Sequence, residues 1–234
     1  MKKINKRLLL VLIGIIFISN INVSIAKAEE NPNRKYKQVL IDPGHGGIDG
    51  GAVSKNGTLE KDLNLSIGLK LKDELMIRDY DVIMTRKKDE GLYTEGKKTI
   101  RQKKNEDLRT RCELKEHTNN DMFISIHMNM FTESKYKGAQ VWYSKNEPSK
   151  RLAKILMEKL KEKLDPNNER IEKETDGKIK VLNCSKNVPS VIIECGFLSN
   201  PEEEKLLLNE EYQFKVVEAI CDAIDEYFKN SNGL

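Results

Sequence analysis

The chain has 234 residues, 33% of them charged, and its 41 basic residues nearly balance its 37 acidic ones. This length suits one hydrophobic core of ordinary size, and two domains would be cramped within it. The charge balance gives no sign of the basic stripe that nucleic-acid-binding domains present, so we expect no nucleic-acid partner.

Residues 1–28 have the pattern of an export signal. The basic stretch MKKINKR precedes the apolar run LLLVLIGIIFI, and Ala26–Ala28 matches the small-x-small cleavage pattern. The run is shorter than the roughly 20 residues of a membrane span, which favours a cleaved signal over an uncleaved anchor. This segment holds five bases and no acid, so the remainder has 36 bases against 37 acids. We expect that remainder to work outside the cytoplasmic membrane.

A polar lead-in at 29–37 is followed by one domain at 38–229, without internal repeats, and by a tail at 230–234. Apolar runs, several rich in Val and Ile, predict strands buried on both faces. These strands are expected at 38–41, 81–85, 122–126, 139–143, 178–182 and 190–193.

Helical patterns alternate with these strands. Apolar residues at helical spacing predict helices at 59–77, at 149–164 with Ser149 as N-cap, and at about 211–229. The stretch SNPEEEKLLL predicts another helix start, with Asn200 as cap and Pro201 in the first position. The alternation predicts an α/β fold, a mainly parallel central sheet flanked by helices on both faces. The charged segment 87–107 lacks an apolar period, and we expect a surface loop there.

Four cysteines follow the export signal: Cys112, Cys184, Cys195 and Cys221. An even number in an exported chain permits two disulfides, with three possible connectivities. The spacings match no zinc-finger pattern. We favour four buried thiols and leave the pairing open.

The stretch QVLIDPGHGGIDGG, residues 38–51, raises the question of function. Five glycines surround His45, one of only three histidines in the chain. His45 follows a predicted strand, His127 ends a second and Glu194 ends a third. Ligands of open α/β sheets collect beyond the carboxyl ends of the strands, so we expect these three side chains to share one site.

Two histidines and one further ligand are typical of a hydrolytic zinc site that keeps a position for water. The third ligand must be a carboxylate or a thiolate, and Glu60 opens the helix after the glycine loop. Asp42 and Asp49 are less suitable ligands; Asp42 is better placed to contact a ligating imidazole. The glycines let this loop turn sharply and let backbone approach the site. A phosphate cradle is disfavoured, because no GK[ST] follows and Asp49 replaces the last glycine of a dinucleotide fingerprint.

The ordered motifs IDPGHGGIDGGA, LEKDLNL, TR at 85–86, DLRTR, DMFISIHMN, GAQVWY and PSVIIECGFLSN carry a resemblance. Together they resemble the zinc-dependent N-acetylmuramoyl-L-alanine amidases of the type 3 family, over residues 38–228. Within this family, the chain resembles the sporulation branch in its length, in its lack of wall-binding repeats and in the charged insertion before DLRTR. Members of that branch help to form muramic lactam in the peptidoglycan of the spore cortex.

The resemblance implies an α/β amidase fold and one zinc ion bound by His45, Glu60 and His127. It also implies that Glu194 is the catalytic carboxylate, which passes a proton from water to the leaving amine. The substrate would be peptidoglycan, cleaved between the lactyl group and L-alanine. The place of action would be the cell wall or the forespore intermembrane space.

Two residues depart from the family pattern. Met128 replaces the alanine of SIHAN and could narrow the cleft, and Glu116 stands where the family tends to have asparagine. Three further polar residues, Asn129, Arg86 and Arg111, are candidates either to contact substrate or to brace loops. His117 is expected to be exposed and not to bind metal.

Two rival functions remain at this point. One is a catalytically silent peptidoglycan-associated recruitment protein, which the full set of zinc ligands plus Glu194 argues against. The other is a cysteine hydrolase that uses Cys195 with His127, although strand alternation turns Cys195 away from Glu194. Because the sequence shows no wall-binding module, we also consider that a separate accessory protein places or activates this domain. The oligomeric state and the stem-peptide preference are left open.

Overall fold

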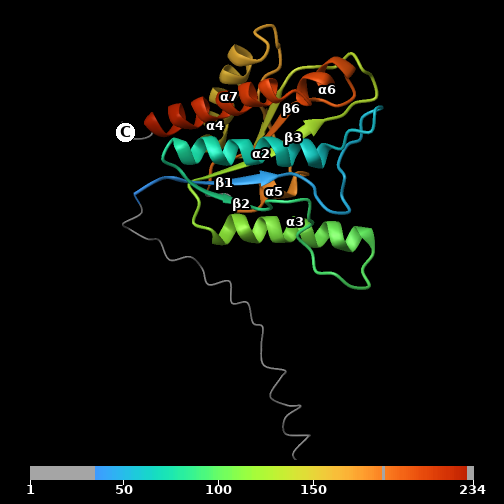
Figure 1. The fold of residues 1–234 in the computed structure, drawn as a ribbon. Helices are drawn as coiled ribbons and strands as arrows, with labels where there is room; N and C mark the ends of the chain where they lie inside the picture. Colours follow the sequence, from blue (N-terminus) through green and yellow to red (C-terminus); the bar gives the residue numbers. More distant parts are fainter. Residues whose placement is uncertain (1–34, 186–187, 231–234) are drawn as a thin grey trace, which may run out of the picture.

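The computed structural model describes residues 35–185 and 188–230 (Figure 1). The predicted export signal lies outside these residues, as do 29–34 of the lead-in and 231–234 of the tail. Among the described residues, no helix combines the length and the apolar character needed to cross a bilayer.

A six-stranded sheet in the order β2-β1-β3-β6-β4-β5 forms the centre of the domain. Neighbouring strands are parallel except for β4, which runs antiparallel to β6. This confirms the predicted mainly parallel sheet. The strands are β1 (Gln38–Pro43), β2 (Asp81–Met84), β3 (Met122–Asn129), β4 (Gln140–Tyr143), β5 (Lys173–Glu174) and β6 (Ser190–Phe197).

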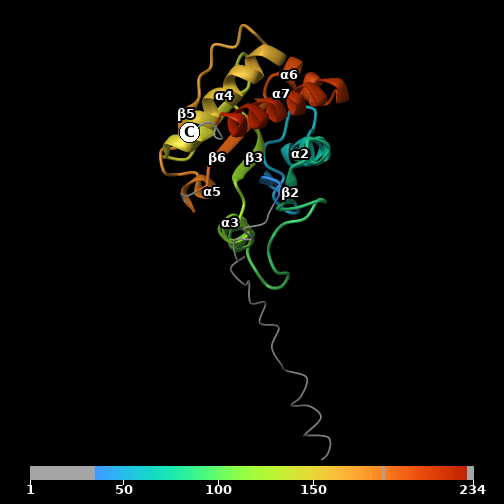
Figure 2. The same cartoon turned by 90° about the vertical axis from the view of Figure 1, so that its left-hand side faces the viewer.

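Helices cover both faces of the sheet, but unequally (Figures 1 and 2). On one face lie α2 (Glu60–Ile77), α4 (Glu147–Lys163) and α7 (Glu210–Lys229), with α6 (Pro201–Leu207) beside α7. On the other lie α3 (Ile100–His117) and the four-residue α5 (Lys180–Asn183). Alternate strand residues divide accordingly. Val39 and Ile41 join the large core under α2, α4 and α7, whereas Leu40 joins a small core with α5.

Most predicted helices are confirmed. Leu63, Ile67, Leu71 and Leu75 of α2 are all buried in the large core. The Asn200 side chain caps α6 by accepting from the backbone N–H groups of Glu202 and Glu203. The N-cap assigned to Ser149 is wrong. Asn146 caps α4 instead, because the helix starts earlier, with proline in its first turn.

Two predicted elements are wrong. The charged segment 87–107 is a loop only as far as residue 99, because Thr99 and Gln102 form a capping box that starts α3. The predicted strand 178–182 is α5, and the strand beside β4 is formed by Lys173–Glu174. Short apolar runs are ambiguous between helix and strand. Here Val181 and Leu182 pack beneath the sheet instead of extending its edge.

The strand order of the sheet reverses at β1. The chain moves from β1 to β2 on one side and then crosses to β3 on the other. The carboxyl ends of β1 and β3 therefore flank a topological switch point, where open α/β sheets bind their ligands.

Candidate active site

Three neighbouring strands deliver the predicted polar residues to one edge of the sheet. His45 directly follows β1, and His127 of β3 pairs in register with Glu194 of β6. Strand alternation turns His127 and Glu194 toward the face of α3 and α5, since Met128 and Cys195 belong to the large core on the opposite face. Glu60, the first residue of α2, joins them from the end of the glycine loop.

His45, Glu60 and His127 form a cluster that could hold a metal ion. One ligand atom of each lies within 4.8 Å of the others. The Glu60 carboxylate lies between the two rings, with Oε2 3.2 Å from His45 Nε2 and Oε1 2.9 Å from His127 Nδ1. Two imidazole nitrogens and one carboxylate form a donor set typical of catalytic zinc, so these residues fit such an ion.

The glycines of the loop leave room for these side chains. A Cβ on Gly44 would lie 2.2 Å from the His127 ring, and one on Gly51 would lie 2.5 Å from Glu60 Oε2. Any other residue at either position would therefore displace a cluster side chain. His45 itself has a φ of +62°, in the left-handed region that non-glycine residues rarely adopt. The backbone is held in this conformation at the site.

The histidine partner predicted from sequence is wrong. Asp49, not Asp42, contacts an imidazole: its Oδ2 lies 3.0 Å from His45 Nδ1. This leaves Nε2 of His45 facing Glu60, and a carboxylate behind a histidine is the usual partner of a metal-binding imidazole. Asp42 is buried and accepts hydrogen bonds from the hydroxyls of Thr85 and Ser125, each at 2.7 Å, and from Arg111.

Arg86 and Arg111 brace the loop that carries His45. Both are 2% exposed. Arg86 donates to the carbonyls of Pro43 at 2.9 Å and of Gly44 at 3.0 Å. Arg111 donates to the carbonyl of His45 at 2.6 Å. Of the two roles left open by the sequence, the contacts favour loop bracing. A loop with few side chains is thus fixed through its backbone carbonyls by two buried cations.

The cluster is electrostatically suited to a cation. Burial opposes protonation of His45, but hydrogen bonds to Asp49 and Glu60 outweigh it and raise its pKa to about 9. Burial would raise the pKa of Glu60, yet its hydrogen bonds to His127 and His45 hold that pKa far below its usual range. Carboxylates thus stabilise positive charge at the imidazoles, and a bound cation would use the same attraction.

Glu194 has a different environment from Glu60. Its Oε2 is buried and has no hydrogen-bond partner among the described residues. Burial, the largest influence, raises its pKa to about 7, with Glu60 adding and both histidines opposing. A carboxyl group that can gain or lose a proton near neutrality is suited to general acid–base work. The neighbouring Cys195 is fully buried in the large core, and burial raises the pKa of its thiol, which argues against a cysteine nucleophile.

A pocket of about 270 Å³ opens beside the cluster, between α3 and α5. His45, His127 and Asp49 lie at one side, and Lys104 and Lys180 also border it. Asp42, Asp107 and Arg111 also line the pocket, and its apolar part is formed by Leu108, Ile179, Val181 and Ile192. This wall was not predicted from the sequence, because the first turns of α3 were predicted as loop and α5 was predicted as a strand.

The two departures from the family pattern lie away from this pocket. Met128 is 3% exposed and packs in the large core, so it does not narrow the cleft as expected. Glu116 is exposed on α3 and does not line the pocket. Asn129 accepts a hydrogen bond from the Met130 N–H at 2.8 Å, which supports a loop-bracing role. His117, expected to be exposed, is half-buried at the end of α3.

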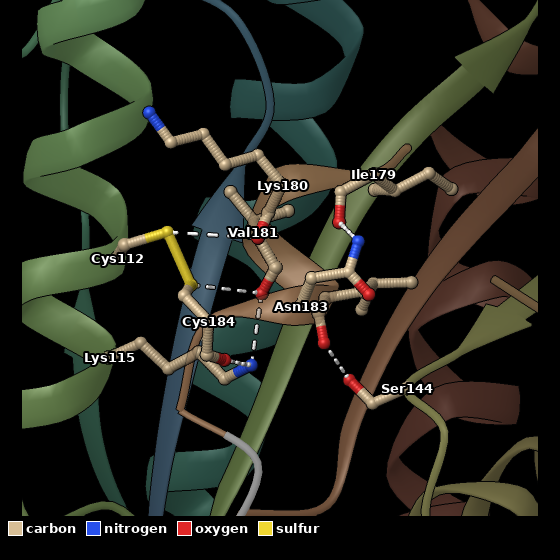
Figure 3. The surroundings of a disulfide bond; sticks show 9 residues. Cys112, Lys115, Ser144, Ile179, Lys180, Val181, Asn183 and Cys184 are labelled. Atoms are coloured by element: carbon tan, nitrogen blue, oxygen red, sulfur yellow. Dashed lines mark hydrogen bonds between the residues drawn. A yellow bond between two sulfur atoms is a disulfide. The ribbon is translucent and has the colours of Figure 1, made fainter. Parts of the chain in front are cut away.

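The favoured prediction of four unpaired thiols is wrong for two of them. Cys112 of α3 and Cys184, directly after α5, form a disulfide (Figure 3), whereas Cys195 and Cys221 are buried thiols. Both bridged residues are half-buried. The bridge joins the two helices that border the pocket.

Fold and site together define an α/β protein with a metal-competent cluster of two histidines and a glutamate. Residues 39–226 match the family model for N-acetylmuramoyl-L-alanine amidases of the Amidase_3 type. The chain therefore belongs to this family of peptidoglycan amidases.

Individual relatives agree with this assignment. The chain is 40% identical to the germination-specific N-acetylmuramoyl-L-alanine amidase of Bacillus subtilis, over 82% of this chain and 80% of that protein. Among solved structures it is similar to the CwlD amidase from Clostridioides difficile, solved in complex with the GerS lipoprotein. That similarity has a TM-score of 0.80 and 47% identity, over 82% of this chain and 98% of that one. An N-acetylmuramoyl-L-alanine amidase from Clostridium difficile 630 matches with a TM-score of 0.71 and 32% identity, over 83% and 97%.

Proposed function

We propose that His45, Glu60 and His127 bind one zinc ion and that Glu194 transfers the proton in the amidase reaction. One observation carries this proposal: a cluster of zinc-type donors lies beside a buried carboxyl oxygen of Glu194, which has no hydrogen-bond partner within residues 35–185 and 188–230. Domain 38–229 would be the catalytic domain, and the substrate would be peptidoglycan.

Zinc in such a site is a Lewis acid that activates water and polarises a carbonyl group. The protein supplies the rest of the chemistry. Asp49 fixes the ring orientation of His45, and the two arginines hold the loop that carries it. Glu194 accepts the proton of the attacking water and then donates it to the amine of L-alanine as the amide bond breaks. The apolar side of the pocket excludes competing water from the peptide.

The similarity to a germination-specific amidase supports a role in the spore cortex, as a step toward muramic lactam. Action on the wall requires export, which the predicted signal at 1–28 would supply. The solved complex of a related amidase with a lipoprotein supports an accessory protein for this chain too. A recruitment role without catalysis is less well supported, because a protein that only binds peptidoglycan does not need a buried Glu194 beside zinc-type donors.

The test is hydrolysis of purified peptidoglycan by residues 29–234, with and without zinc, beside Glu194→Gln and His45→Ala. We expect zinc-dependent release of free L-alanine amino termini by the unmodified protein. Loss of a proton-transfer group typically costs about 10²–10⁴-fold, so Glu194→Gln should keep zinc and lose turnover. His45→Ala should lose zinc itself. Near-normal turnover of Glu194→Gln, or full zinc occupancy in His45→Ala, would contradict these roles.

A further inference from the structure

Helix α5 forms one wall of the pocket beside the metal-competent cluster. Ile179, Lys180 and Val181 line the pocket from this wall, opposite Leu108 and Arg111 of α3. With four residues, α5 is far too short to be stable as an isolated helix. Its side chains at the pocket are therefore only as well placed as the contacts that attach α5 to the rest of the protein.

Two of those attachments come from one face of α3. Cys112 forms the disulfide with Cys184, with 5.8 Å between the Cα atoms (Figure 3). Lys115 lies three residues further on, a spacing that places both side chains on the same side of the helix. Its ammonium group donates to the carbonyls of Val181 at 2.9 Å and of Cys184 at 2.8 Å.

The Lys115 contacts are those of a C-terminal cap supplied by another helix. The last carbonyls of a helix lack partners within it, and a cation is favourable at that end. Lys115 is 1% exposed, and in the part of the chain that the structure describes its hydrogen bonds go to carbonyl groups and not to a carboxylate. A buried ammonium group is costly unless it is hydrogen-bonded. The two bonds from Lys115 to carbonyl groups are therefore needed in the folded protein, and they attach α5 to α3.

The metal-competent cluster is held independently of α5. His45 is fixed through Arg86, Arg111 and Asp49, and Glu60 and His127 belong to α2 and β3. Leu182 of α5 also packs in the small core, and its carbonyl accepts from the Ser144 hydroxyl, so α5 stays near the sheet without the bridge. Loss of the bridge should therefore move the pocket wall without dismantling the cluster.

We propose that the Cys112–Cys184 disulfide and Lys115 position α5 as the substrate-binding wall of the pocket, so that opening the bridge weakens binding of the muramyl peptide while the metal stays bound. The proposal rests on the proposed amidase function, since it names the part of that site that receives the peptide. The mainly apolar wall with Lys180 at its edge suits a short peptide that combines a small apolar side chain with a carboxylate.

The test compares the unmodified protein before and after treatment with a phosphine, and adds Cys112→Ala/Cys184→Ala. The phosphine gives two electrons to the S–S bond and becomes the phosphine oxide with an oxygen from water, whose two protons complete the two thiols. Binding of a soluble N-acetylmuramoyl tripeptide is measured by calorimetry in a Glu194→Gln background. Zinc content and KM with the active protein are measured in parallel.

We expect Kd and KM to rise about tenfold in both the reduced protein and the double variant, with kcat and zinc content unchanged. The double variant should not respond to phosphine, which excludes an effect of the reagent on the metal. Lys115→Met should weaken binding in the same direction, and Lys115→Arg should restore part of it.

An unchanged Kd after reduction would overturn the proposal, as would loss of zinc in step with the bridge, since that would indicate general destabilisation. Because Kd is measured without turnover, failure of the amidase assay is a separate result: it would reject the proposed function and leave the binding comparison to decide the role of the bridge.

Discussion

The two sides of the pocket are built in different ways. On the metal side, each side chain comes from a strand end or a helix start, and several hydrogen bonds from strands and long helices hold the cluster and its loop. On the α3–α5 side, the wall is a four-residue helix attached by a bridge between residues 72 positions apart. The first side was recognisable from motifs in the sequence, whereas the second depends on a short helix whose attachment to α3 no motif announces. The sheet thus positions the metal-competent cluster, whereas contacts with α3 position α5, the proposed peptide-binding wall.

The comparison predicts that the metal side tolerates no added volume. In Gly44→Ala the new methyl group would lie 2.2 Å from the His127 ring and overlap it. The φ of Gly44 lies outside the left-handed region, so the backbone itself can accept alanine. We expect the ring to move and zinc affinity to fall by more than the roughly 10–100-fold that loss of an outer partner costs. Zinc titration with a competing chelator measures this.

Gly50→Ala is the matched control in the same loop. Among the described residues, its added Cβ would meet Leu59 Cδ2 alone, at an ordinary 3.5 Å. Equal zinc affinity for the two alanine variants would break the comparison, because it would mean that the loop moves freely to accommodate either methyl group.

A smaller effect is expected where the partner of a histidine is changed. Asp49→Asn keeps the shape of the side chain but removes the charge that orients His45. We expect zinc affinity to fall by about 10–100-fold, measured by the same titration. Asp89→Asn is the control, because Asp89 bonds Lys61 and the Gly47 N–H in the neighbouring loop. A variant of Asp49 that behaves like the Asp89 variant would exclude an orienting role.

The wall side should contribute a pH dependence of its own, through Lys115. Burial lowers the pKa of Lys115 from 10.5 to about 8. Between these values the unfolded chain binds more protons than the folded one, so the free energy of unfolding rises with pH. From pH 7 to pH 10, the unmodified protein should gain roughly 2 kcal/mol relative to Lys115→Met.

Urea unfolding followed by circular dichroism at the two pH values measures this difference. Lys154→Met, on the exposed side of α4, is the control and should follow the unmodified protein. A Lys115→Met profile parallel to that of the unmodified protein would show that the buried ammonium group has an ordinary pKa.

The same contrast explains what could be predicted from the sequence. The strands before His45, His127 and Glu194 were predictable because strands buried on both faces consist of apolar residues. Helix α3 was predicted as loop in its first turns because residues 100–107 are almost all charged or polar and show no apolar period. The disulfide could not be predicted because only the fold brings Cys112 near Cys184. Asp42 was preferred over Asp49 because the loop conformation, with His45 at a φ of +62°, is not visible in a sequence.

The bridge also changes the covalent topology of the chain. It closes a ring that contains β3, β4, α4, β5 and α5. The connection after β3 is exposed at residues 130–135, within this ring. A protease that cuts there once opens the ring but releases no fragment, because the two pieces stay joined through sulfur. Such a nicked chain would migrate as one species without reductant and as two with it, so covalent continuity survives a single break in the main chain.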